Sequence, residues 1–246
     1  MLLRTKDLSV AFGGIRAVDG VDFSLPNGEL RALIGPNGAG KTTFFNAVSG
    51  RYRPTSGSVI FDGTDITGLP PRKIVRLGLV RTFQISSIFP GLTVFENVWA
   101  ACHSSHSLFE TVVSPVARRG IAERADSILE TLEIQGLASQ LASELSYGDQ
   151  RVVEIAVALG LRPKLLLLDE PTAGMSPAET GRIVRLINRL RADLTIVIVE
   201  HDMDLIMNLA DRISVFDRGQ LLVEGTPSEI RANETVRRIY LGASAC

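Results

Sequence analysis

The sequence lacks several features that would restrict its class. Among 246 residues there are two cysteines, Cys102 and Cys246, and they form no C-x-x-C pair. The absence of such a pair argues against a cysteine zinc motif. We expect reduced thiols, although the sequence also permits a disulfide between the two. No apolar run approaches the ~20 residues that cross a bilayer, and residues 1–10 lack the apolar segment of a signal peptide. We therefore expect a cytosolic protein whose contact with a membrane is peripheral and made through a partner.

An excess of charge of one sign is also missing. The 26 Lys and Arg residues balance 27 Asp and Glu residues, which leaves a formal net charge of −1. Nucleic-acid-binding domains usually carry a basic excess, so the overall charge gives no indication of a nucleic acid as partner, although a local basic patch stays open. Hydrophobic residues make up 45% of the chain, which is enough for the core of an ordinary globular protein.

The most informative segment that is present, GPNGAGKTT, runs from Gly35 to Thr43 directly after an apolar run at 30–34. It contains the phosphate-loop pattern G-x-x-x-x-G-K-[ST]. Such a loop aims backbone N–H groups at a nucleotide's phosphates, and the positive end of the following helix adds to the attraction. Lys41 can reach the β- and γ-phosphates, and the Thr42 hydroxyl can ligate Mg²⁺. The predicted phosphate-binding residues are Gly35, Pro36, Asn37, Gly38, Ala39, Gly40, Lys41, Thr42 and Thr43.

Two further apolar runs end in side chains suited to nucleotide hydrolysis. The run 165–168 is followed by Asp169 and Glu170, and the run 195–199 is followed two residues later by His201. Ligands of open α/β sheets bind beyond the carboxyl ends of the strands, so these side chains should meet the phosphate loop. Asp169 is then placed to bind Mg²⁺, Glu170 to activate a water, and His201 to hydrogen-bond the γ-phosphate or that water. The plainer alternatives are a solvated acidic turn and a structural histidine.

The remaining polar candidates are weaker. The amide of Gln84 could contact Mg²⁺ or the attacking water, or it could be an ordinary surface amide. His103 and His106 have a spacing that could hold a metal, but no third ligand is evident, and we expect no metal there.

The order of strand and helix signals predicts an α/β fold with a mostly parallel sheet, an antiparallel β portion and an inserted helical subdomain. Capping signals should start helices near Thr93, Ser176 and Thr226, and residues 103–120 should form a long loop or a short-helix insertion. The expected strands cover residues 8–12, 21–25, 30–34, 58–61, 165–168 and 195–199, followed by a hairpin at 212–216 and 220–224. The expected helices of the middle part cover residues 123–132 and 151–161.

Together with Leu145 to Arg151, which reads LSYGDQR and is similar to the signature LSGGQ, these segments resemble the ATP-binding subunit of ABC transporters. The motifs occur in the family's order over essentially the whole chain. Details resemble most closely the subunits of bacterial branched-chain amino acid importers. These details are FGG at 12–14, YGDQR, EHDM at 200–203, the ending GTPSEI…YLG and the insertion at 103–120.

The resemblance implies one ABC ATP-binding domain over residues 1–246 with a P-loop NTPase core. Residues 1–84 and 163–246 would form the nucleotide-binding core with the β subdomain, and residues 85–162 the helical signature subdomain. Two such domains would sandwich two ATP molecules head to tail, and Ser146 and Gly148 would contact the γ-phosphate bound by the other chain. Phe12 would stack on adenine, unless it packs in the core. The implied catalytic residues are Glu170, His201, Lys41 and Gln84, and the implied Mg²⁺ ligands are Thr42, Gln84 and Asp169.

Three residues depart from the family's pattern. Tyr147 replaces the first signature glycine, and Asp149 replaces glutamine. A carboxylate would repel phosphate, so we expect Asp149 to face away from it. Ser176 stands where many members have an aspartate that helps couple the two sites, which leaves the strength of that coupling open.

The implied partners are two membrane-spanning permease subunits, a second ATP-binding subunit in a hetero- or homodimer, and a solute-binding protein acting through the permease. No nucleic acid is implied, and the location would be the inner face of the cell membrane. The residues Ile85, Ile88, Phe89 and Leu92 could receive a short permease helix or could be core. The alternatives are import of urea or amides, export of lipid or lipopolysaccharide, and a soluble non-transport ABC-type ATPase. A nucleotide sensor without turnover is disfavoured because the catalytic groups are present.

Overall fold

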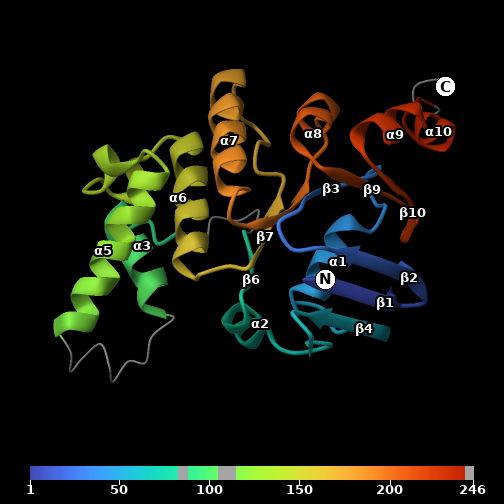
Figure 1. Cartoon of the computed structure of the whole chain (residues 1–246), viewed down its shortest axis with the longest axis horizontal. Coiled ribbons are helices and arrows are strands. Elements are labelled where there is room, and N and C mark those ends of the chain that lie inside the picture. The colour runs from blue at the N-terminus through green and yellow to red at the C-terminus, as the bar shows by residue number, and fades with distance from the viewer. Residues whose placement is uncertain (83–87, 105–114, 242–246) are drawn as a thin grey trace.

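The computed structural model describes residues 1–82, 88–104 and 115–241, and its elements form two sheets flanked by helices (Figure 1). The strands are β1 (Leu3–Phe12), β2 (Ile15–Leu25), β3 (Leu30–Ile34), β4 (Ser56–Phe61), β5 (Thr64–Asp65), β6 (Leu79–Arg81), β7 (Leu165–Asp169), β8 (Thr195–Val199), β9 (Arg212–Asp217) and β10 (Gln220–Gly225). The helices are α1 (Lys41–Val48), α2 (Pro71–Leu77), α3 (Val94–Ser104), α5 (Pro115–Thr131), α6 (Tyr147–Gly160), α7 (Pro177–Leu190), α8 (Met203–Leu209), α9 (Pro227–Ala232) and α10 (Glu234–Leu241).

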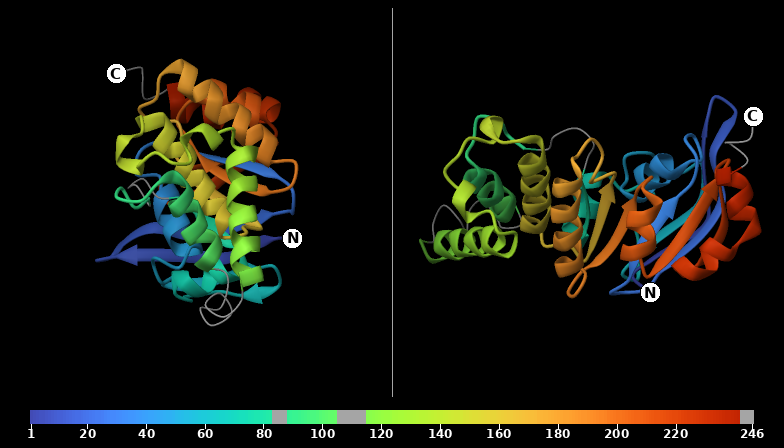
Figure 2. Two further views of the ribbon diagram at one scale, coloured as in Figure 1. Left: turned by 90° about the vertical axis from the view of Figure 1, so that its left-hand side faces the viewer. Right: turned by 90° about the horizontal axis from the view of Figure 1, so that it is seen from above.

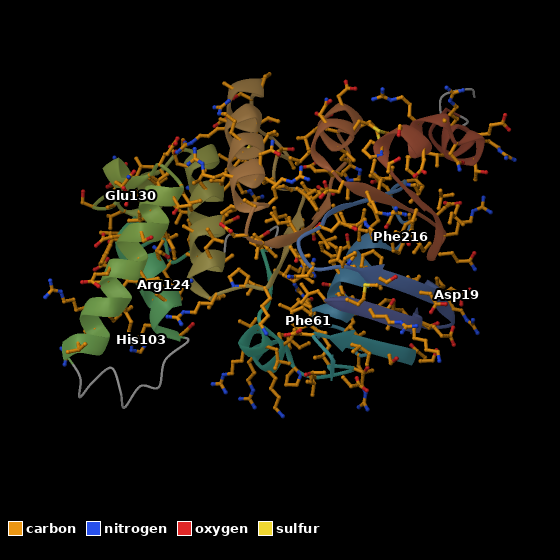
Figure 3. All side chains as sticks on the ribbon, viewed as in Figure 1. Asp19, Phe61, His103, Arg124, Glu130 and Phe216 are labelled. Carbon is orange, nitrogen blue, oxygen red and sulfur yellow. The ribbon has the colours of Figure 1, made fainter. Side chains whose placement is uncertain are left out.

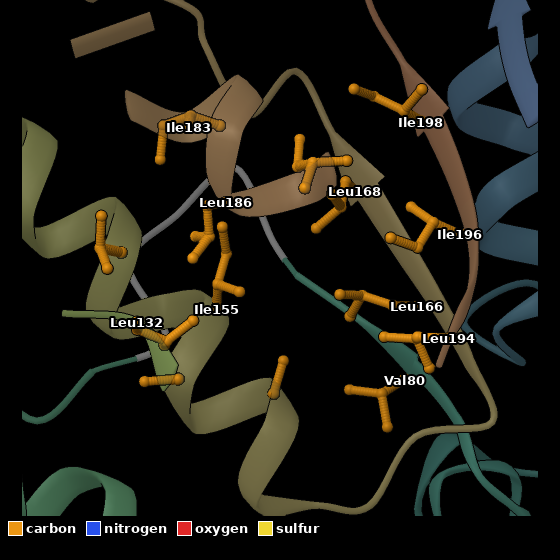
Figure 4. Packing of buried hydrophobic residues seen from close by; sticks show 14 of the residues in the cluster. Val80, Leu132, Ile155, Leu166, Leu168, Ile183, Leu186, Leu194, Ile196 and Ile198 are labelled. Atoms are coloured by element: carbon orange, nitrogen blue, oxygen red, sulfur yellow. The ribbon is translucent and has the colours of Figure 1, made fainter. Parts of the chain in front are cut away.

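The central sheet has the strand order β10-β9-β3-β8-β7-β6. Its neighbours pair in parallel except for the antiparallel hairpin of β9 and β10, as predicted. All five residues of β7 are buried, because both faces of the sheet are covered. Leu166 and Leu168 face the cluster that contains α6 and α7 (Figure 4). Leu165 and Leu167 belong to the cluster on the other face, which contains α1.

A second, antiparallel sheet has the order β2-β1-β4-β5, and α1 is packed between the two sheets (Figure 2). The ring of Phe44 on α1 lies 5.3 Å from Phe23 of β2 and 5.3 Å from Phe216 of β9, measured between ring centroids. The helix that carries the phosphate loop is therefore fixed by aromatic contacts to both sheets.

The helical part, α3, α5 and α6, lies between β6 and β7 in the chain and at one end of the molecule. Figure 3 shows His103, Arg124 and Glu130 there, far from Asp19. The predicted start of α3 is confirmed: Thr93 Oγ1 accepts from the N–H of Glu96, and the Glu96 carboxylate accepts from the N–H of Thr93. The expectation of a loop or short helix over 103–120 is wrong at its C-terminal end, where the 17-residue α5 begins at Pro115. A proline suits the first turn of a helix because no N–H is required there.

The C-terminal elements follow their capping signals. Ser176 and Thr226 each form a complete capping box, at the starts of α7 and α9. Among the helices of the described residues, none combines the length and the apolarity that crossing a bilayer requires.

Candidate nucleotide-binding site

The loop between β3 and α1 depends on glycine at two positions. Gly35 has a φ of 154°, and a Cβ there would lie 2.2 Å from the carbonyl oxygen of Phe216. Gly40 has a φ of 100° and caps α1, and a Cβ there would lie 2.4 Å from the carbonyl oxygen of Ala17. The loop therefore packs directly on the backbone of β2 and β9, which only residues without a side chain permit.

A cavity of about 320 Å³ lies over this loop. It brings together most of the predicted phosphate-binding residues with Glu170 and His201, which come from the ends of β7 and β8. This arrangement confirms the predicted juxtaposition for Glu170 and His201, whereas Asp169 is not among the residues around the cavity. The residues around the cavity are Ala17, Asn37, Gly38, Ala39, Gly40, Lys41, Thr42, Thr43, Glu170 and His201.

Lys41 is held inside the loop. Its Nζ donates to the carbonyl oxygens of Gly35, at 2.6 Å, and Pro36, at 3.0 Å. Burial lowers the pKa of Lys41, and the negative charges of Glu170 and Asp169 oppose that shift. Gly35 and Pro36 do not line the cavity, and their carbonyls serve instead to position the ammonium group.

The carboxylate of Asp169 is almost fully buried, and its Oδ2 accepts from Nη2 of Arg81 at 2.7 Å. In the described part of the chain its Oδ1 has no hydrogen-bond partner, although this oxygen is buried. A carboxylate oxygen without a hydrogen-bond partner suits Mg²⁺, which prefers oxygen ligands. Thr42, an exposed residue with a hydroxyl group, lies at the cavity. The third predicted metal ligand, Gln84, lies outside the described residues.

Glu170 and His201 form the polar pair at the cavity. Nε2 of His201 lies 2.7 Å from Oε1 of Glu170, which is hydrogen-bond distance for either tautomer. Glu170 has a φ of 48°, a backbone conformation that non-glycine residues adopt at a cost of about 1 kcal/mol or more. Its N–H donates to the carbonyl of Val199, so β8 holds the strained residue in place.

Glu200 is a site residue that the sequence patterns did not single out. Its carboxylate, in a residue only 4% exposed, accepts hydrogen bonds from the N–H of Thr172 at 3.0 Å, the hydroxyl of Thr172 at 2.6 Å and the N–H of His201 at 3.1 Å. Glu200 thereby ties the segment after Glu170 to the segment that carries His201. The available signal was a charged residue directly after a wholly apolar strand.

We expect Glu200→Ala to lower the free energy of unfolding by about 1–2 kcal/mol, because three partly buried hydrogen bonds lose their acceptor. Chemical denaturation monitored by circular dichroism measures this change. Glu200→Gln, which keeps one acceptor oxygen, should lose less. The control is Glu130→Ala on the exposed surface of α5, and equal stability losses for Glu200→Ala and Glu130→Ala would contradict the assigned bonds.

The signature segment begins α6, four residues earlier than predicted, because Ser146 caps the helix. Ser146 Oγ donates to Oδ2 of Asp149 at 2.7 Å, and Oδ1 of Asp149 accepts from Arg182 on α7 at 2.6 Å. Burial would raise the pKa of Asp149, but the bonds from Ser146 and Arg182 outweigh it and the pKa is lowered. Its charge is therefore engaged by an arginine of its own chain, and the expectation that it faces away from phosphate stays a prediction.

Gly148 is buried against α7, where a Cβ would lie 2.5 Å from Oε1 of Glu179. Neither Ser146 nor Gly148 lines the cavity of its own chain. A role for these two residues in nucleotide binding therefore requires a second chain.

Three other predictions concern residues outside the cavity. Phe12 is 48% exposed, with its ring centroid 5.2 Å from that of Tyr52, so the alternative of core packing is wrong and adenine stacking stays a prediction. Of the apolar residues near Gln84, Ile88 is core, Leu92 is partly buried and Phe89 is 61% exposed. Ile85 and His106 lie outside the described residues, and the described residues contain no cluster of three or more His, Cys, Asp or Glu side chains that could hold a metal.

Comparisons with known proteins agree with this geometry. The family model "ABC transporter" matches residues 18–173, and "Branched-chain amino acid ATP-binding cassette transporter" matches residues 220–245. The high-affinity branched-chain amino acid transport ATP-binding protein LivG of Escherichia coli is 44% identical, with 98% of each chain covered. The corresponding protein BraF of Pseudomonas aeruginosa is 41% identical over 98% of each chain. The lipopolysaccharide export system ATP-binding protein LptB of Escherichia coli is 37% identical over 98% of this chain and 97% of the relative.

Solved structures resemble the chain over nearly its full length. A nucleotide-free ATP-binding cassette from an ABC transporter superimposes with a TM-score of 0.85 at 33% identity, covering 97% of this chain and 98% of that one. The ADP conformation of an ATP-binding cassette gives a TM-score of 0.84 at 33% identity, with 98% of each chain covered.

Proposed function

The chain belongs to the ATP-binding subunits of ABC transporters, which bind and hydrolyse ATP, and we propose that it powers the import of branched-chain amino acids. The observation that carries this proposal is the match of residues 220–245, in the C-terminal part of the chain, to the family model of branched-chain amino acid ATP-binding cassettes. Relatives named for this solute are 38–45% identical over nearly the full chain. The relative that serves lipopolysaccharide export is 37% identical, which makes export the second candidate.

The proposed chemistry uses the cavity over the phosphate loop. Loop N–H groups and the start of α1 bind the phosphates, and Lys41 exchanges its carbonyl partners for phosphate oxygens. Glu170 accepts a proton from the attacking water, and His201 orients that carboxylate through their 2.7 Å contact. Thr42 and Asp169 would hold Mg²⁺, which when bound stabilises negative charge on the phosphates.

The proposed active form is a head-to-tail dimer with a second ATP-binding subunit, identical or related. The start of α6, where the exposed residue Ser146 caps the helix and the helix dipole is positive, would face the γ-phosphate bound by the other chain. Closure of the dimer around two ATP molecules would then be a two-state switch driven by ligand binding.

The proposed membrane partners are two permease subunits at the inner face of the cell membrane, together with a solute-binding protein outside. Phe89, exposed next to the buried Ile88, offers an apolar contact for a short permease helix. The chain would be held at the membrane by its contacts with these subunits.

Uptake by the native host tests the solute. A strain without this chain should take up radiolabelled leucine, isoleucine and valine more slowly, and the wild-type chain should restore uptake where Glu170→Gln does not. Affinity purification of tagged Glu170→Gln with ATP and Mg²⁺ from gently solubilised membranes should recover two multi-spanning proteins. Unchanged amino acid uptake together with lost urea uptake, or with defective lipopolysaccharide export, would reject the proposed solute while leaving the ATPase assignment intact.

A further inference from the structure

A buried arginine that no motif accounts for stands beside the carboxylate of the candidate metal site. Arg81 ends β6, which pairs in parallel with β7 and places Arg81 opposite Leu167. The side chains of Arg81 and Asp169 are 5% and 1% exposed, and Nη2 of the arginine lies 2.7 Å from Oδ2 of the aspartate. This ion pair is therefore shielded from solvent.

The helix of the phosphate loop holds the same guanidinium group. Nη1 of Arg81 donates to the side-chain oxygen of Asn46 at 2.6 Å, and its Cζ lies 5.5 Å from the centroid of the Phe45 ring. Both residues belong to α1. The arginine thus joins β6, β7 and α1, and its charge is fixed in place by contacts on at least two sides.

The geometry leaves one oxygen of Asp169 available. Arg81 occupies Oδ2, whereas Oδ1 accepts no hydrogen bond within the described residues. A buried carboxylate without a positive neighbour is strongly destabilised, so a site that must exist before metal arrives needs a counter-ion. Arg81 meets that need without covering the second oxygen.

We propose that Arg81 is the resident counter-ion of Asp169, balancing its charge while no metal is bound and weakening the carboxylate's attraction for Mg²⁺. The inference rests on the proposed function, since it takes Asp169 to serve the metal of a bound nucleotide. The positive charge of Arg81 repels Mg²⁺ from the same carboxylate. It also offsets the free-energy cost of burying the charge of Asp169, so Mg²⁺ gains less by neutralising that charge. Arg81 would thus keep the empty site stable and its hold on the metal moderate.

The test uses a non-hydrolysable ATP analogue, whose dissociation constant is measured by calorimetry once with EDTA and once with Mg²⁺. The quantity compared is the ratio of the EDTA value to the Mg²⁺ value, which grows as the metal contributes more to binding. In Arg81→Met the ratio should rise by about tenfold or more over wild type, because a carboxylate that has lost its counter-ion gains more from the metal. Arg81→Lys keeps the charge and should stay within about threefold of wild type. An unchanged or smaller ratio in Arg81→Met would overturn the inference.

Arg31→Met is the matched control for the loss of a buried arginine. Arg31 is 3% exposed and paired with Glu29 and Glu224, away from the cavity residues. This variant should lose stability and keep the wild-type ratio, and a rise equal to that of Arg81→Met would count against a specific role of Arg81. Thermal melting without nucleotide shows whether each variant is folded, and the ratio is read only at temperatures below its transition.

Asp169→Asn separates this inference from the proposed function. If Asp169→Asn lowers the ratio while Arg81→Met does not raise it, Asp169 serves the metal and the counter-ion role of Arg81 fails. If Asp169→Asn leaves the ratio at the wild-type value, the assignment of Asp169 to the metal fails and the inference fails with it.

Discussion

Glu170→Gln is expected to bind ATP with near wild-type affinity and to lose ATPase activity by about 10²-fold or more. Glu170 lines the cavity and its carboxylate lies 2.7 Å from His201 Nε2, where it can accept a proton from water. The amide of glutamine has almost the same shape but cannot accept that proton. Because hydrolysis would reopen the proposed dimer, the variant should also remain closed with ATP bound.

Phosphate release measures the rate, and size-exclusion chromatography with ATP and Mg²⁺ measures dimer formation. Glu130→Gln, on the exposed surface of α5, is the matched control and should behave as wild type in both. Hydrolysis by Glu170→Gln within a few-fold of the wild-type rate would remove Glu170 from the role of general base.

Lys41→Ala is expected to weaken ATP binding by about 10- to 100-fold. Hydrogen bonds to charged groups contribute about 1.5–3 kcal/mol, and Lys41 is the cation that the phosphate loop itself supplies to the cavity. The same ammonium donates to the Gly35 and Pro36 carbonyls and lies at the cavity over the loop, where the phosphates would bind.

Calorimetry with ATP gives the affinity, and thermal melting reports whether the loop keeps its structure without the two carbonyl contacts. The comparison variant is Lys164→Ala, since Lys164 pairs with Asp62 on the surface and is 55% exposed. An affinity of Lys41→Ala equal to that of Lys164→Ala, in a folded protein, would contradict the assigned role of the loop.

Local signals in the sequence predicted the positions where the nucleotide site is built. The glycine pattern, the two apolar runs that end in Asp169 and His201, and the capping boxes each depend on residues close together in the chain. Their geometry is confirmed for the start of α7 at Ser176 and for the cavity that joins the loop to Glu170 and His201. The catalytic roles of these residues stay predictions.

Contacts between distant segments could not be predicted in the same way. The pairing of Arg81 with Asp169 depends on the register of β6 against β7, and the bonds from Thr172 to Glu200 depend on the neighbouring ends of β7 and β8. The start of α5 could not be read from Pro115 alone, because proline is common both in loops and in the first turn of a helix.

The helical part and the central sheet share one continuous apolar cluster, which includes Val80, Leu166 and Leu168 of the sheet and Ile155 of α6 (Figure 4). Lifting α6 away from the sheet would expose this surface to water, whereas a small slide would keep it covered. The Asp149–Arg182 pair also ties the start of α6 to α7. Packed interfaces of this kind move by shear rather than by hinge opening. Any motion that reaches a membrane partner should therefore be a short displacement of the whole helical part. The length of that displacement would be limited by how far the packed side chains can move between neighbouring rotamers.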